Sequence, residues 1–240
     1  IIHNISVKNG RFEARGDATE QAMVGSVAGM APSQSFVSLV KVSKTEVRAD
    51  DFNYVGGLIG KVSDSKLEDA SFFGSIDVQG ENGLYVGGAV GYMYSATALD
   101  NGLKRVSTRG NIESHSNEVG GLIGTIDGSY IESSYSNMSL NVRYDENTKL
   151  GGLYGNSINS SEHSNNYFSG HITTDCSVNC GVGDILGAGT ISGGGTIVHE
   201  NSEIPTSAYP VMSEADFTGA TTAGAMAAFK ADPFVLTLGT

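Results

Sequence analysis

Carboxylates are the side chains most able to do chemistry in this sequence, so their spacing decides whether an enzyme is expected. Glycoside hydrolysis needs two carboxyl groups about 5 Å or 6.5–9.5 Å apart. Glu68 and Glu132 fall at equivalent positions of a repeat described below, and Lys104 occupies the position between them. We therefore expect a charged ladder on a solvated face and no catalytic residue. A polysaccharide lyase or hydrolase on a β-helix scaffold is the alternative function.

Histidines and serines give no stronger signal. No His-Glu-x-x-His or Gly-x-Ser-x-Gly motif occurs, so neither a zinc site nor a nucleophilic serine is predicted. His3 and His163 are expected in equivalent columns at opposite ends of the repeats. We expect no cofactor. Calcium is the one metal left open, because the chain is acidic. The Gly-Gly-x-Gly-x-Asp repeat of calcium-loaded β-rolls is absent, which argues against calcium.

Cys176 and Cys180 lie four residues apart in a predicted turn. Two cysteines alone cannot complete a four-ligand zinc site. In a secreted chain such a pair closes a small disulfide loop, which is the interpretation that we favour, with free thiols as the alternative.

The binding candidates are two tyrosines that share a column of the repeat, two tyrosines that precede its longest insertion, residues 95–102, and one threonine within that insertion. They are Tyr54, Tyr85, Tyr92, Tyr94 and Thr97. Insertions in repeat arrays commonly form the binding feature. These residues are therefore the predicted contact surface for a surface glycan or protein ligand, with structural packing as the alternative role of the tyrosines.

Composition and charge narrow the class of protein. The 240 residues include 33 glycines and only 4 prolines, a combination that fits neither collagen nor a disordered linker. The 14 basic residues are scattered among 26 acidic ones, giving a net charge of −12, which argues against a nucleic-acid partner. No apolar run approaches the roughly 18 residues of a membrane span, so no membrane insertion is expected.

Six copies of a short glycine phrase determine where all these residues lie. The phrase reads Val-Gly-Gly-Leu-Ile-Gly at its most regular, and its copies begin 31, 31, 33, 31 and 32 residues apart. The first residues of the copies are Val24, Val55, Val86, Val119, Leu150 and Val182. Repetition at such a period is the signature of a solenoid or an array of repeats.

The segments between the glycines are short and rich in β-branched residues, which favours strands over helices. We predict an all-β fold: a right-handed, three-sided parallel β-helix (solenoid) with about 31 residues per coil. Equivalent residues then stack about 4.8 Å apart, so the first residues of the phrases form an internal aliphatic ladder. The second glycines either adopt positive φ at corners or let backbone segments approach closely. They are Gly57, Gly88, Gly121 and Gly152.

The repeats resemble a known pattern. Val-Gly-Gly-Leu-Ile-Gly, followed by a stretch such as Ser129-Tyr-Ile-Glu-Ser-Ser134, is similar to the GLUG motif. That motif occurs in tandem in large bacterial surface and secreted proteins, including adhesins. The resemblance covers roughly residues 1–200 and implies a bacterial, extracellular β-solenoid. It carries no catalytic residues to transfer.

Two parts of the chain are predicted. Residues 1–200 form the β-solenoid repeat domain, and residues 201–240 form a C-terminal capping segment with a short helix and a final strand. Leu58 and Ile59 are both apolar where a strand with one wet face would alternate. Either the C-terminal helix covers that side, or the Gly-Gly pair bulges the strand. The chain begins in mid-coil without an initiator methionine, so we expect it to belong to a larger polypeptide.

The predicted function is a non-catalytic binding or adhesion module, extracellular or on a bacterial cell surface. It would present a solenoid face or the 95–102 loop to a glycan, host or cell surface. An ice-binding surface is the second alternative. The column after each phrase reads Lys61, Tyr92, Thr125 and Asn156, and this irregularity argues against an ice-binding plane.

Overall fold

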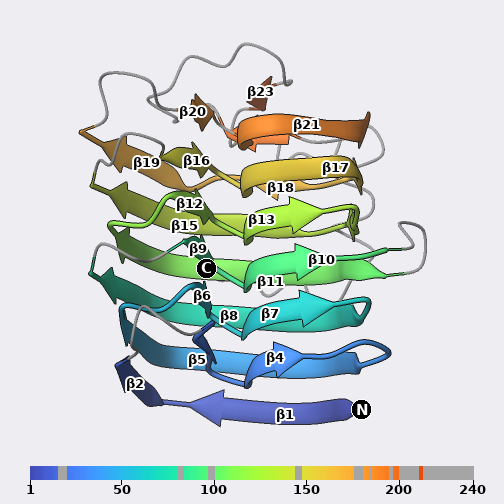
Figure 1. The fold of residues 1–240 in the computed structure, drawn as a ribbon. Helices are drawn as coiled ribbons and strands as arrows, with labels where there is room; N and C mark the ends of the chain where they lie inside the picture. Colours follow the sequence, from blue (N-terminus) through green and yellow to red (C-terminus); the bar gives the residue numbers. More distant parts are fainter. Residues whose placement is uncertain are drawn as a thin grey trace.

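The fold is an all-β stack of parallel coils. The computed structural model describes residues 1–15, 21–80, 84–96, 101–143, 148–175, 181–183, 185–194, 197–199 and 211–212. The coils follow one another along a single axis, from β1 (Ile2–Lys8) at one end to β21 (Leu186–Gly194) near the other (Figure 1). The predicted right-handed, three-sided parallel β-helix is confirmed.

The first side of each coil is a three-residue strand at the start of the glycine phrase. These strands form a six-stranded parallel sheet. Its members are β3 (Met23–Gly25), β6 (Tyr54–Gly56), β9 (Tyr85–Gly87), β12 (Glu118–Gly120), β16 (Lys149–Gly151) and β20 (Gly181–Gly183). The register pairs Val24 with Val55 and continues in the same column to Val182. The chain therefore makes five complete turns from the first phrase to the sixth. The ladder residues from Val55 to Leu150, including both, are fully buried.

The second side follows the turn of the phrase. Its strands are β4 (Ala28–Ala31), β7 (Ile59–Ser63), β10 (Val90–Tyr94), β13 (Ile123–Asp127) and the first parts of β17 (Tyr154–Ser164) and β21. Figure 1 shows them one above another. Ile59 and Val62 point into the core, whereas Lys61 between them is only half-buried. This alternation leaves one face of the side outward.

The third side is the longest. In the middle coils it is one bent strand, and in later coils it is divided. Its strands are β1, β2 (Arg11–Arg15), β5 (Phe36–Asp50), β8 (Lys66–Gln79), β11 (Gly102–Ser114), β14 (Tyr130–Glu132), β15 (Tyr135–Val142), the end of β17, β18 (Tyr167–Phe168), β19 (His171–Thr174), β22 (Ile197–His199) and β23 (Val211–Met212). The bend is made by one residue per coil with φ between 50° and 57°. These residues are Asn4, Leu39, Asp69, Arg105, Ser133 and Asn165.

The glycines of the phrase permit close approach of neighbouring coils. A Cβ added to Gly57 would overlap the carbonyl oxygen of Gly88, and Gly88 and Gly121 face Gly121 and Gly152 in the same way. The left-handed region is instead used by glycines outside the phrase, such as Gly128 with φ 66°. Of the two roles expected for the second glycines, the structure therefore shows close backbone approach.

The two adjacent apolar columns are explained by the turn between β6 and β7. The backbone N–H groups of Leu58 and Ile59 both donate to the carbonyl oxygen of Ala89 at 3.0 Å. Both side chains are fully buried in the same core. The local turn at the Gly-Gly pair thus accounts for the pattern without an external helix.

One predicted column is wrong. His3 lies beside Ser38, whereas His163 lies beside Ile131, so the two histidines occupy different columns. The first two coils each contain one additional residue in the left-handed region, Asn9 with φ 54° and Lys44 with φ 52°, and the register shifts at Lys44. Counting at a fixed spacing therefore misplaces His3 by one residue.

Several predictions fall outside the described residues. Cys176 and Cys180 are among them, and so are Thr97 and almost all of the predicted C-terminal segment, residues 201–240. The disulfide, the loop contact and the capping helix therefore stay predictions.

Candidate functional site

Three tyrosines from neighbouring coils meet on the outer surface. The Tyr54 and Tyr85 rings are stacked with centroids 5.2 Å apart, and the Tyr92 ring lies edge-on to Tyr54 at 5.8 Å and 5.1 Å from Tyr85. Tyr54 and Tyr85 are register partners on the first side, and Tyr92 reaches them from the second side. Tyr54 is only 8% exposed, whereas Tyr85 and Tyr92 are half-buried. Tyr54 is therefore the packed base of this tyrosine cluster, and the other two form its surface.

Lys61 adds a positive charge to the tyrosine cluster. It is the register partner of Tyr92 in the coil below. Its ammonium nitrogen lies 5.0 Å from the Tyr54 ring centroid and 5.6 Å from that of Tyr92. Such cation–π contacts contribute about 0.5–1 kcal/mol at exposed sites. They hold the ammonium group beside the rings, where it can also meet a ligand.

Hydrogen bonding fixes the outer edge of the cluster. The Tyr92 hydroxyl donates to Asp127 Oδ2 at 2.8 Å, and the Asn159 amide also donates to that carboxylate. Burial, followed by the Asp127 carboxylate, raises the pKa of Tyr92 far above its ordinary value. Burial and the Glu118 carboxylate also raise the pKa of Tyr85. Both phenols are therefore neutral hydrogen-bonding groups at physiological pH.

The chain carries an insertion at the corner beside the cluster. Seven residues, 95–101, replace the two that stand between Ser63 and Lys66 in the coil below. The Ala96 N–H donates to Asp64 Oδ1 at 2.7 Å, which ties the start of the insertion to that coil. The chain therefore has five additional residues between Tyr94 and Gly102 compared with the coil below.

Tyr94 lies between the cluster and the insertion. It follows Tyr92 by two residues on β10, so both side chains are on the outward face of that strand. Tyr94 is half-buried. The structure thus places four predicted tyrosines along two sides of one corner, and three of them are in ring contact.

The cluster ends at a buried polar group. Glu118 occupies the column of Tyr54 and Tyr85 in the next coil, and it is 9% exposed. Its carboxylate accepts hydrogen bonds from Lys149 Nζ at 2.6 Å and Asn156 Nδ2 at 3.0 Å, and also from the Thr125 hydroxyl. The outward column of the first side therefore changes from an aromatic to an ionic residue within one coil.

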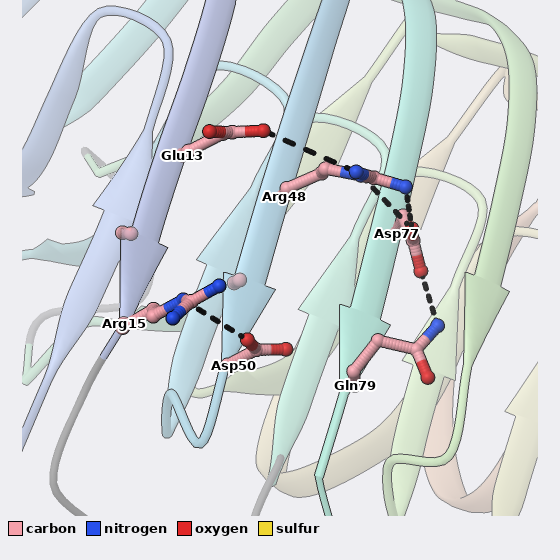
Figure 2. Close-up of a pocket in the computed structure, with 8 residues that line it drawn as sticks. Glu13, Arg15, Arg48, Asp50, Asp77 and Gln79 are labelled. Atoms are coloured by element: carbon pink, nitrogen blue, oxygen red, sulfur yellow. Dashed lines mark hydrogen bonds and ion pairs between the residues drawn. The ribbon is translucent and has the colours of Figure 1, made fainter.

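A hollow of about 300 Å³ lies on the third side of the first coils. Figure 2 shows its charged side chains, which come from β2, β5 and β8. Arg48 reaches Asp77 at 3.2 Å and Glu13 at 3.9 Å, and Arg15 reaches Asp50 at 3.7 Å. The charged side chains are paired with one another, the lining has a formal charge of −1, and no aromatic side chain lines the hollow. This surface offers little to select a ligand.

The carboxylates form the ladder expected from the sequence. Glu68, Lys104 and Glu132 are register partners, and Lys104 Nζ lies 2.7 Å from Glu132 Oε2. Within the described ranges, no group of three or more His, Cys, Asp or Glu residues is placed to hold a metal ion. The same part of the chain contains no helix long and apolar enough to cross a membrane.

Three residues of the cluster and its edge were not singled out as binding residues from the sequence: Lys61, Asp127 and Glu118. Glu118 directly precedes a glycine phrase, Lys61 directly follows one, and Asp127 occupies the column of Tyr94. Comparing the outward columns of the first and second sides together would have grouped these residues with the tyrosines.

The chain is similar to part of a much longer protein. Over 131 residues it is 30% identical to Halomucin from Haloquadratum walsbyi. That stretch is 51% of this chain and 1% of Halomucin. No family model matches the chain, and no solved structure matches it.

Proposed function

We propose that the chain is a non-catalytic binding module of an extracellular or cell-surface protein and contacts a surface glycan or protein ligand. The observation that carries this proposal is the partly exposed surface formed by Tyr85, Tyr92 and Tyr94 with Lys61, beside the insertion at 95–101. Aromatic side chains with few rotatable bonds dominate binding hot spots. A sugar ring can also lie flat against a phenol.

An extracellular location is supported by two resemblances. The chain is similar to a segment of Halomucin, of which it spans 1%, and its glycine phrases resemble the GLUG repeats of bacterial surface and secreted proteins. In both cases the repeats would be one part of a larger polypeptide. On this proposal the module acts as an adhesin segment that displays its outer face to a partner.

The non-catalytic part of the proposal is supported by how the carboxylates are bound. Glu118 is bound by Lys149, Thr125 and Asn156. Asp127 is bound by Tyr92 and Asn159. These hydrogen bonds hold both carboxylates against neighbouring side chains of the same face. Release of reducing ends or unsaturated products from any polysaccharide would overturn this part.

A glycan array tests the binding proposal. The wild type and Tyr94→Ala would be compared, with Phe73→Ala as the matched control. Phe73 is 43% exposed on β8, away from the cluster. We expect Tyr94→Ala to lose most of the array signal and Phe73→Ala to keep it. Equal signals from all three proteins would refute the tyrosine surface as the binding face.

A further inference from the structure

A second hollow, of about 240 Å³, lies around the corner from Tyr94, at the end of the insertion. It is lined by Lys66, Glu68, Gly102, Leu103, Lys104, Tyr130 and Glu132. The column that runs from Lys66 through Gly102 to Tyr130 explains its shape, because Gly102 has no side chain between the two long ones. We call it the Gly102 hollow.

The hollow is built into the fold. A Cβ on Gly102 would overlap the backbone carbonyl oxygen of Tyr130, so the coils approach too closely at this point for any other residue. The gap between Lys66 and Tyr130 therefore follows from the stacking of coils and does not depend on a side-chain rotamer. Gly102 contributes only backbone atoms to the lining, and Tyr130 lines the hollow beside it.

Polar groups around the hollow are held by fixed partners. Lys104 Nζ lies 2.7 Å from Glu132 Oε2, and the Tyr130 hydroxyl bonds to the same carboxylate. Arg105 Nη2 lies 3.3 Å from Glu68 Oε2. The lining thus combines two cationic donors, Lys66 and Lys104, with two anionic acceptors and one phenol. Its formal charge is zero.

We propose that the Gly102 hollow is a subsite for one neutral sugar unit of a glycan, an inference that rests on the proposed glycan-binding function. A neutral lining favours neither a cation nor an anion. Vicinal hydroxyls need donors and acceptors side by side, and the alternation of Lys66, Glu68, Lys104 and Glu132 provides both. The Tyr130 ring supplies an apolar wall for the C–H face of the sugar. The hollow is smaller than the roughly 300–1,000 Å³ of drug-sized sites, which suits a single unit.

The carboxylates act as acceptors in this subsite. Burial raises the pKa of Glu132, but the hydrogen bonds from Lys104 and Tyr130 outweigh burial, and the pKa is lowered from its ordinary value. Glu132 is therefore ionised at neutral pH and has no proton to give to a glycosidic oxygen.

Titration of the full chain with oligosaccharides, followed by calorimetry, tests the proposal. The probes are neutral gluco-, xylo-, manno- and galacto-oligosaccharides and, as the charged comparison, oligogalacturonate. The variants are Glu68→Gln, Lys66→Gln and Tyr130→Ala. The matched control is Glu162→Gln, which lies in the same column beyond Tyr130 and outside the lining. Melting temperatures establish that each variant is folded.

We expect at least one neutral oligosaccharide to bind, with roughly tenfold weaker binding for Glu68→Gln and Lys66→Gln, as when a charge-assisted hydrogen bond is lost. Glu162→Gln should bind as the wild type does. Neutral binding that Glu68→Gln and Lys66→Gln leave unchanged would overturn the subsite while the tyrosine surface stands. Binding of oligogalacturonate alone would overturn the neutral ligand class. If no oligosaccharide binds in solution but the glycan array gives a signal that Tyr94→Ala loses, the subsite fails and the binding function stands; if nothing binds in either assay, the subsite and the glycan-binding function both fail.

Discussion

Two neighbouring columns of the first side are constrained very differently. The inward column, from Val24 to Val182, contains only valine and leucine. The outward column, one residue earlier in the chain, reads Met23, Tyr54, Tyr85, Glu118, Lys149 and Gly181. Inside, each residue must fit the residues of the coils above and below. In the outward column, the residue of one coil can differ from those of its neighbours, so adjacent coils can carry a tyrosine cluster and an ionic group.

The largest loss of stability is expected from a charged substitution in the inward column. Val119→Asp places a carboxylate among fully buried aliphatic side chains. With no partner for the charge, the free energy of unfolding should fall by about 5 kcal/mol or more. Thermal unfolding followed by circular dichroism would show loss or splitting of the transition. Thr173→Asp, on an exposed position of β19, is the control and should melt like the wild type. A normal melting curve for Val119→Asp would remove Val119 from the core.

A smaller loss of stability is expected when a substitution disturbs the spacing between coils. A Cβ at Gly88 would overlap the carbonyl oxygen of Gly121 and approach Thr108 Cβ at 3.1 Å. Backbone cannot shift as a side chain can, so Gly88→Ala should cost roughly 1–3 kcal/mol. Gly10→Ala is the matched control, because its new Cβ would meet the Phe12 ring, which can rotate away. Equal melting temperatures for the two variants would contradict close approach as the role of the phrase glycines.

The contrast between the two columns also explains how much the sequence could predict. The phrases repeat at 31 to 33 residues because they form the tightly packed turn between the first and second sides. The fold class and the inward ladder follow from that repetition. The third side gives no such constant spacing: Val37 to Leu67 is 30 residues, whereas Leu67 to Leu103 is 36. Corners can gain or lose residues without disturbing the stacked sides.

Backbone conformation at the bend of the third side was beyond sequence reasoning. Leu39, Asp69 and Arg105 share one left-handed conformation in one column, although they have no side-chain chemistry in common. For a similar reason, the sequence predicted only part of the tyrosine cluster. Tyr54 and Tyr85 share a column, but Lys61 contacts Tyr54 across the turn between two sides, and the spacing within one column does not report that contact.

His163 offers a test where the interior departs from its aliphatic pattern. It is 3% exposed in the column of Leu67, Leu103 and Ile131, and burial lowers its pKa. As pH falls below about 6.5, the unfolded chain takes up the proton before the folded chain does. Stability should therefore decrease on acidification, by up to about 1.4 kcal/mol per pH unit from this group.

His163→Leu should flatten that decline, measured as melting temperature between about pH 7.5 and 5. His171→Leu, at a half-buried position of β19, is the comparison and should keep the wild-type slope. An unchanged slope in His163→Leu would show that other groups cause the acid sensitivity.

The smallest effect is expected on the exposed charges shown in Figure 2. Arg48 contacts Glu46 at 3.1 Å and Asp77 at 3.2 Å, but its side chain is 47% exposed. Exposed ion pairs contribute about 0–1 kcal/mol and are screened by salt. Arg48→Gln should therefore lower the melting temperature only slightly, and less at high salt. Arg105→Gln should lower the melting temperature more, because Arg105 is 25% exposed and binds Asp69 through two hydrogen bonds.

The Arg48 variant also tests the contrast between the columns. If Arg48→Gln lowered the melting temperature as much as Gly88→Ala, the outer columns would be as constrained as the inner ones. The freedom that lets one coil carry a binding surface would then have no basis in this fold.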